Sequence, residues 1–176
     1  MTDSTRDKIT DYARSAVSRT IFEAVRDAGG PIVDRLISDR HPDWGTTRDV
    51  TPADGLMAAQ AIVGSARREL NGYIRQAREH GISWRKIGDL LGLADDAKAQ
   101  DVSAADLAFD LAAGPRNDCS WSERYMLWRC RDCAELINDY GPEAYPEPGR
   151  NSHAPGCKRL AVERRAYTAY ERQRSQ

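Results

Sequence analysis

Long hydrophobic runs are missing from this sequence. No apolar stretch approaches the roughly 20 residues that a membrane span needs. The first residues, MTDSTRDKIT, are polar and charged, unlike a secretory signal peptide. We therefore expect a cytoplasmic protein that does not bind membranes. In that reducing compartment, the four cysteines predict metal binding or redox chemistry before disulfide bonds.

The sequence motifs of common enzyme classes are also absent. The chain contains no GxSxG nucleophile motif, no phosphate-binding P-loop and no GxGxxG dinucleotide motif. His41 and His80 lie in segments with no cysteine or acidic residue placed to complete a catalytic set. These absences favour a non-enzymatic protein.

An overall excess of positive charge is lacking, because the formal net charge is −1. The net charge of the whole chain therefore gives no indication of a nucleic-acid partner. The C-terminal residues 158–174 differ from the rest, with six Lys or Arg against two Asp or Glu. Lys158, Arg165 and Arg172 recur every seven residues there, so we expect a basic helix with these cations on one face. The apolar stripe expected on this helix consists of Val162, Ala166, Ala169 and Tyr170.

Apolar residues recur at helical spacing through the first two thirds of the chain. A helix is predicted over about 9–25, before Gly29-Gly30-Pro31. A short apolar piece (32–38) and a loop follow. A second long helix is predicted from the N-cap Thr51, and short helices from the caps Ser83 and Ser103. The predicted buried stripe of the second helix is Leu56, Ala59, Val63, Ala66, Leu70, Tyr73, Ile74 and Ala77. The expected fold class is mainly α, with a helical domain over 1–115.

The segment EHGISWRKIGDLLGLADDAKAQ also contains apolar, small and turn-forming residues in a recognisable order. The apolar, small and turn positions of this pattern are Ile87, Gly88, Leu91, Gly92 and Leu93. With the helix before it, this stretch (about 65–101) resembles bacterial helix-turn-helix regulators. The resemblance implies a support helix over 84–91 and a recognition helix over about 94–101.

That resemblance also implies double-stranded DNA as the partner. Arg85 and Lys86 would lie near backbone phosphates, and Lys98 near base edges. A basic stretch precedes them, with Arg67, Arg68, Arg75 and Arg78. Three carboxylates oppose DNA binding, because phosphates repel them. They are Asp95, Asp96 and Asp101.

The composition changes after Gly114, where Pro, Gly and Asn replace apolar runs. Such a stretch cannot bury a large hydrophobic core, so it needs a cross-link such as a bound metal ion to fold stably. Cys130-x2-Cys133 and His153-x3-Cys157 are two ligand pairs that together supply the Cys3His set favoured by tetrahedral zinc. Two alternatives remain open. The cysteines can serve as small core residues, or Cys119 can replace His153 in a four-cysteine iron–sulfur site.

The two ligand pairs, followed directly by a helix, resemble treble-clef-like CCHC zinc fingers over residues 128–172. The resemblance implies zinc ligation by Cys130, Cys133, His153 and Cys157. Structural sites of this kind leave no coordination position for a substrate. We therefore expect residues 116–176 to form a small zinc-stapled module ending in the basic helix.

The leading hypothesis is a non-enzymatic DNA-binding regulatory protein with a structural zinc site. Its expected DNA-binding residues are Arg85, Lys86, Lys98, Lys158, Arg165 and Arg172. One alternative is a zinc-stabilised interaction module whose partner is another protein or a second copy of the chain. The other alternative is an iron–sulfur redox sensor. The sequence does not distinguish a DNA site or assign a role to Cys119.

Overall fold

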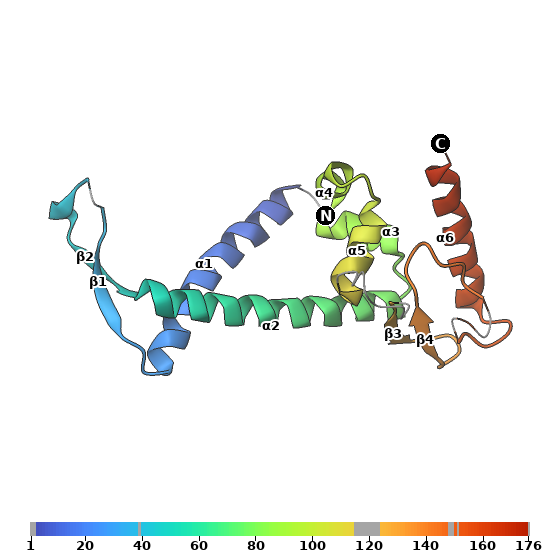
Figure 1. Cartoon of the computed structure of the whole chain (residues 1–176), viewed down its shortest axis with the longest axis horizontal. Coiled ribbons are helices and arrows are strands. Elements are labelled where there is room, and N and C mark those ends of the chain that lie inside the picture. The colour runs from blue at the N-terminus through green and yellow to red at the C-terminus, as the bar shows by residue number, and fades with distance from the viewer. Residues whose placement is uncertain (1–2, 39, 115–123, 148–149, 151, 176) are drawn as a thin grey trace. The chain divides into compact units, whose positions relative to one another are not determined.

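The structure is a computed structural model that describes residues 3–38, 40–114, 124–147, 150 and 152–175. It is mainly helical, as the sequence predicts (Figure 1). The elements are α1 (Asp3–Asp27), β1 (Ile32–Leu36), the 3-10 helix η1 (Pro42–Trp44), β2 (Thr46–Val50), α2 (Pro52–Glu79), α3 (Trp84–Leu91), α4 (Ala94–Ala99), α5 (Ala104–Ala113), β3 (Met126–Arg129), β4 (Leu136–Asp139) and α6 (Lys158–Arg174). They form two compact units, unit 1 (1–67) and unit 2 (68–176), and α2 belongs to both.

The helix starts follow the capping signals of the sequence. The side chain of Thr51 accepts the backbone N–H of Asp54 at 3.2 Å. The side chain of Ser83 accepts the N–H of Lys86 at 3.3 Å. Ser103 and Asp106 form a reciprocal capping box, with both backbone bonds at 3.1 Å. These bonds satisfy N–H groups that a helix leaves unpaired at its first turn.

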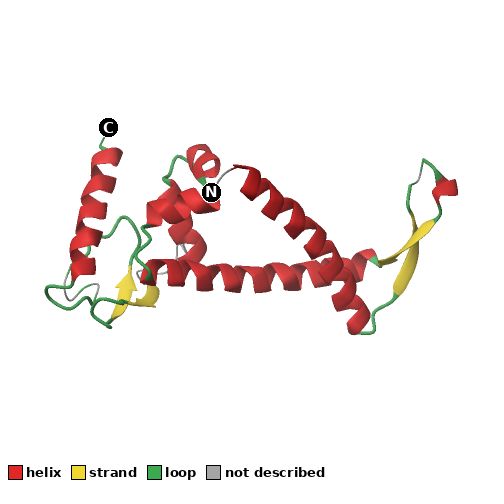
Figure 2. Cartoon of the chain, turned by 180° about the vertical axis from the view of Figure 1, so that it is seen from behind, coloured by secondary structure: helices red, strands yellow, loops and turns green. Residues whose placement is uncertain are grey.

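Unit 1 consists of α1, an antiparallel β-hairpin and the first part of α2 (Figure 2). The register pairs Ile32 with Val50 and Leu36 with Thr46. Residues 46–50 were expected to be loop. They pair as a strand because Thr and Val residues favour extended backbone when a complementary segment lies opposite. Val25 is the one buried hydrophobic side chain in the described part of unit 1, so this unit has almost no core of its own.

Unit 2 contains the main hydrophobic core. Its buried members come from α2, α3, α5 and the β3–β4 hairpin: Ile74, Trp84, Ile87, Ala105, Ala108, Phe109, Met126, Trp128, Cys130 and Ile137. A two-stranded hairpin cannot bury its own apolar face, so it needs helices against it. The compact units therefore do not coincide with the expected domains 1–115 and 116–176, because residues on both sides of position 115 share one core.

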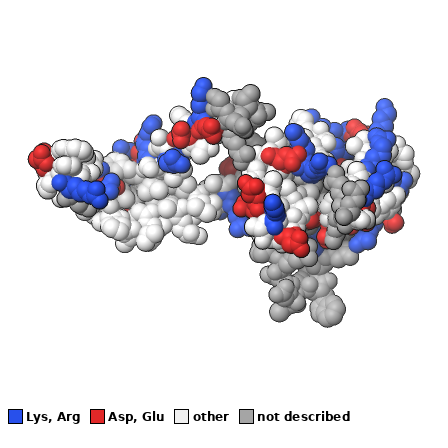
Figure 3. Space-filling view, turned by 90° about the horizontal axis from the view of Figure 1, so that it is seen from above, with Lys and Arg blue, Asp and Glu red and all other residues white. Residues whose placement is uncertain are grey.

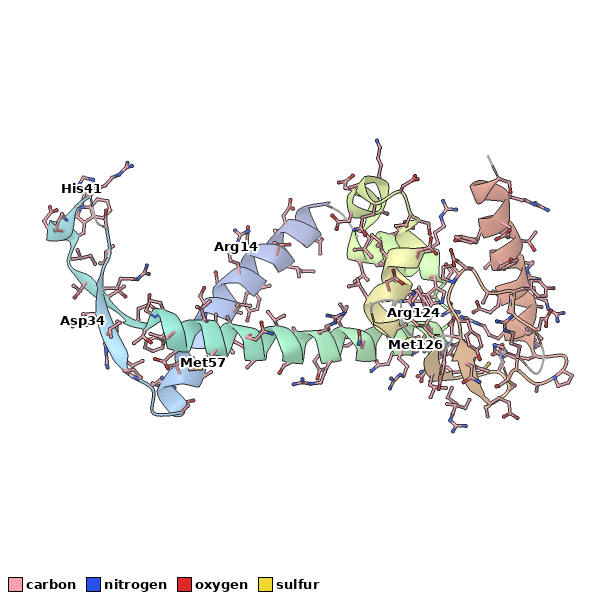
Figure 4. All side chains as sticks on the ribbon, viewed as in Figure 1. Arg14, Asp34, His41, Met57, Arg124 and Met126 are labelled. Atoms are coloured by element: carbon pink, nitrogen blue, oxygen red, sulfur yellow. The ribbon has the colours of Figure 1, made fainter. Side chains whose placement is uncertain are left out.

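Two glycines permit close approach in this core. Gly88 on α3 lies so near Ala104 on α5 that a Cβ would overlap the Ala104 carbonyl. Gly141, at φ 90°, lies against the ring of Phe109 in the same way. Arg124, just before β3 (Figure 4), adds a bond to Asp110 at 2.6 Å. The Gly88 contact packs α3 against α5, and the contacts of Gly141 and Arg124 position the β3–β4 hairpin against α5.

Two predicted buried stripes are wrong in part. On α2, Ile74 is buried, whereas Leu56 and Val63 are exposed, because no described element of the chain covers that face of the helix. Tyr73 is adjacent to Ile74 in the chain but is exposed. On α6, Val162 and Ala169 are exposed. Leu160, which was not part of the predicted stripe, is buried instead.

Candidate metal centre

The first ligand pair is held by the turn between β3 and β4. Cys130 directly follows β3, and its N–H donates to the carbonyl of Glu135 at 2.9 Å. The N–H of Ala134 donates back to the carbonyl of Cys130 at 2.8 Å, and Ala134 has a left-handed φ of 58°. These two bonds close a tight turn that carries Cys130 and Cys133 together.

The second pair precedes α6. Cys157 is the N-cap residue of α6, and its N–H donates to the carbonyl of Ala154 at 3.1 Å. His153 lies immediately before this turn. The chain reversal therefore returns Cys157 toward His153, so that both approach the β3–β4 turn.

The four side chains converge on one point. Their ligand atoms, three Sγ and one imidazole nitrogen, all lie within 4.8 Å of one another. The Sγ atoms of Cys130 and Cys157 are 3.8 Å apart, and the Sγ of Cys133 is 3.6 Å from Nδ1 of His153. A tetrahedral centre with bonds of about 2.0–2.3 Å has edges of about 3.3–3.8 Å. The geometry therefore fits a tetrahedral metal ion, and the predicted Cys3His cluster is confirmed.

The protonation of the cluster suits a cation. Burial lowers the pKa of His153. The carboxylates of Glu163 and Asp139 oppose this shift and the guanidinium groups of Arg159 and Arg78 add to it, so the pKa stays below its usual value and the imidazole is neutral at neutral pH. Burial raises the pKa of Cys130 to about 11. For Cys133, burial is outweighed by hydrogen bonds from the backbone at Ala154 and Glu135, and the pKa falls. Metal coordination favours the thiolate form of cysteine, so a bound cation would stabilise the deprotonated ligands.

The cluster adjoins the core of unit 2. Trp128 on β3 lies edge-on to His153, with ring centroids 5.7 Å apart. Cys130 and His153 are both buried, at 1% and 3% exposed. These surroundings exclude water from one side of the site.

A buried ion network lies beside the cluster, and the sequence analysis missed it. Arg78, at the end of α2, is 2% exposed. Its Nε donates to Asp139 on β4 at 2.8 Å, and its Nη2 donates to Glu163 on α6 at 2.9 Å. Arg159 donates to the other oxygen of Glu163 at 2.7 Å and to the carbonyl of Arg78 at 3.2 Å. The network joins α2, β4 and α6.

Asp139 accepts the largest number of hydrogen bonds in this group of buried residues. The indole N–H groups of Trp84 and Trp128 donate to its two oxygens at 3.0 and 2.9 Å. The N–H of Gly141 adds a bond at 3.0 Å. Burial alone would raise the pKa of Asp139, but Arg78 and these donors lower it, so the carboxylate is ionised. A buried charge with this many partners is satisfied rather than strained.

Arg78 is one of the basic residues that precede Arg85 and Lys86 in the sequence, but its guanidinium is buried and paired rather than exposed. One feature of the sequence indicated that Arg78 could be buried, namely its spacing from an apolar residue of the same helix. Arg78 follows Ile74 by four residues, so both lie on one helical face. Nothing local identified Asp139 and Glu163 as its partners, since they lie 61 and 85 residues away in the chain.

The six residues expected to bind DNA are all exposed. Arg85 and Lys86 lie in the first turn of α3, Lys98 lies on α4, and Lys158, Arg165 and Arg172 lie on α6. Gly92, between α3 and α4, has the left-handed φ of 72° expected of a turn glycine. Helix α4 is shorter than the expected recognition helix and ends at Ala99. The helix-turn-helix assignment remains a prediction.

A cavity of about 430 Å³ lies within unit 2. Trp84 and Arg85 of α3 border it on one side, and Tyr167 and Tyr170 of α6 border it on another. The ion pair of Arg78 and Glu163 lies at its wall. Helices α3 and α6 therefore border the same cavity, but its α6 side does not include Lys158, Arg165 or Arg172.

Comparison with known proteins gives no further assignment: no protein-family model, curated protein or solved structure matches the chain. Among the described residues, no helix is long and apolar enough to cross a membrane. Cys119, the residue on which the iron–sulfur alternative depends, lies outside the described residues.

Proposed function

We propose that this protein is a non-enzymatic DNA-binding regulator whose C-terminal part is held by one structural zinc ion. The observation that carries the metal assignment is the convergence of three thiols and one neutral imidazole within 4.8 Å. Thiolate and imidazole ligands in a tetrahedral set favour zinc over harder cations. Four protein ligands fill the coordination sphere, which supports a structural role over a catalytic one.

The metal would act on function through α6. Cys157 is both a ligand candidate and the N-cap residue of α6, so metal binding fixes the start of this helix. Two residues later, Arg159 pairs with Glu163, which also pairs with Arg78 of α2. The exposed face with Lys158, Arg165 and Arg172 is therefore oriented by the metal and by the ion network.

Exposed cations on two neighbouring elements support the DNA proposal. Arg85 and Lys86 stand at the start of α3, and α6 borders the same cavity as Arg85. Arginine and lysine side chains contact phosphates without regard to base sequence, and such contacts supply most of the affinity of weak DNA binders. Asp95 and Asp96 on α4 oppose binding near Lys98, so we expect affinity to depend on α3 and α6 more than on α4.

The metal assignment predicts one zinc ion per chain by elemental analysis of the purified protein. Cys133→Ser should abolish stoichiometric zinc, because it removes one of four ligands. Cys119→Ser is the matched control and should retain the metal. Zinc retained by Cys133→Ser, or a visible iron–sulfur absorption band that Cys119→Ser removes, would contradict the assignment.

The DNA proposal predicts a salt-dependent affinity for duplex DNA, measured by fluorescence anisotropy. The double variant Arg85→Ala/Lys86→Ala should weaken binding to all duplexes and reduce the slope of log K against log salt by about 2, because two phosphate contacts are lost. Arg14→Ala/Arg48→Ala removes two exposed cations from unit 1 and should leave the slope unchanged. Equal effects of the two double variants, or a wild-type protein that binds no duplex at low salt, would favour the protein-interaction alternative.

A further inference from the structure

Unit 1 exposes the side chains that would normally form a core. Three large apolar residues of α1, Ile9, Tyr12 and Val17, are exposed. So are three of α2: Leu56, Met57 and Val63. Helix α1 makes its main contacts with β2 rather than with α2. In the space-filling view, uncharged residues cover much of this unit on the left (Figure 3).

The apolar side chains of α2 follow a regular seam. Leu56, Val63 and Leu70 are spaced by seven residues, and Ala59, Ala66 and Tyr73 alternate with them at spacings of three and four. This repeat of 3.5 residues is the pattern of a coiled-coil seam.

The two ends of that seam have different surroundings. Leu70 and Ala77 pack against the core of unit 2. Leu56 is 73% exposed and Val63 is 60% exposed on the same face of the helix. Met57 of α2 is also exposed beside this seam (Figure 4). Tyr73, between Leu70 and Ala77, is 66% exposed. The described part of the chain therefore covers the seam only at Leu70 and Ala77 and leaves the rest of its apolar side chains exposed.

The exposed area matches the requirement of a stable protein interface. The six side chains on α1 and α2 are between 43 and 75% exposed. One of them is aromatic and five are aliphatic or methionine side chains, so together they offer an exposed apolar area on the order of several hundred Å² per chain. A standard interface buries about 800 Å² on each partner.

We propose that a second copy of this chain covers this surface, with α1 and the first half of α2 of each copy forming a helical interface. Unit 1 carries nine Lys or Arg against ten Asp or Glu, so two copies meet without strong repulsion. Four residues flank the seam. Gln60 and Ile62 are uncharged, and Arg67 and Glu69 carry opposite charges. A twofold pair uses the same patch on both copies, which suits a single self-complementary seam.

The test is sedimentation velocity of the full-length, zinc-loaded protein over a range of micromolar concentrations. The wild type should sediment with twice the chain mass of 19.6 kDa. Val63→Lys should raise the dimer dissociation constant by about 30-fold or more, because it places a charge in the desolvated centre of the interface. Leu56→Lys, one heptad earlier, should do the same. Both side chains are largely exposed in the single chain, so neither change removes a buried contact within it.

Ala61→Lys is the matched control, because it adds the same charge two residues from Val63 on the opposite face of α2. It should change the dissociation constant by less than about threefold. A monomeric wild type would overturn the proposal, as expected if α1 covers the seam or a different protein binds there. A dimer that Val63→Lys and Leu56→Lys leave intact would overturn it too. Neither outcome depends on DNA or on the identity of the metal.

Discussion

Removal of the metal should unfold the helices of unit 2 together with the cysteine-bearing turns. The physical reason is the shared core, in which Met126 and Trp128 of β3 pack with Trp84 of α3 and Phe109 of α5. Structural zinc contributes on the order of 10 kcal/mol to folding in small metal-stabilised domains. Losing it removes the anchor of the β3–β4 hairpin, and the helices then lose one wall of their core.

Hydrogen–deuterium exchange before and after chelation measures this effect. Amides of α3 and α5 should lose protection by about two orders of magnitude or more, because local protection is limited by the free energy of opening. Amides of α1, in unit 1, provide the internal control and should change little. If α3 and α5 keep their protection while only residues 126–157 exchange faster, the helices fold independently of the metal and the expected boundary near 115 is a real folding boundary.

The second large effect is expected from Arg78→Met. This change keeps the length of the side chain but removes a buried charge that pairs with Asp139 and Glu163. Removing one partner of a buried ion pair typically costs about 3–5 kcal/mol, because the remaining charges stay buried without compensation. Two indole N–H groups still reach Asp139, so the cost should fall within this range rather than above it.

Urea unfolding of the full-length, zinc-loaded protein, followed by circular dichroism, measures the decrease in the free energy of unfolding. Arg75→Met is the matched control, since Arg75 lies three residues earlier on α2 and is exposed. It should shift the free energy of unfolding by less than about 0.5 kcal/mol. Similar small shifts for both variants would show that the network contributes little net stability, as happens when desolvation offsets the attraction between charges.

The local features of this protein were readable in the sequence because each depends on neighbouring residues. Thr51, Ser83 and Ser103 cap the helices for which they were predicted to be caps. Gly92 takes the left-handed conformation of the expected turn. The ligand spacings also sufficed, since a CxxC turn and a histidine four residues before a cysteine each bring two ligands together locally.

The hairpin of unit 1 was missed for a different reason. Ile32 to Leu36 and Thr46 to Val50 are short, and each is ambiguous alone. A strand is specified by its partner across the ladder as much as by its own residues. The pairing of Ile32 with Val50 therefore decided a structure that neither segment predicted.

The sequence by itself determined the mainly helical class, the helix starts and the four metal-ligand candidates, because helical periodicity, capping and ligand spacing act over a few residues. Only the tertiary structure decided that the parts on either side of residue 115 share one core and that Arg78 is buried rather than available to phosphates. It also decided that the seam of α2 is covered at Leu70 and bare at Leu56. These outcomes depend on which distant segments meet, and burial and pairing between such segments leave no local pattern in the chain.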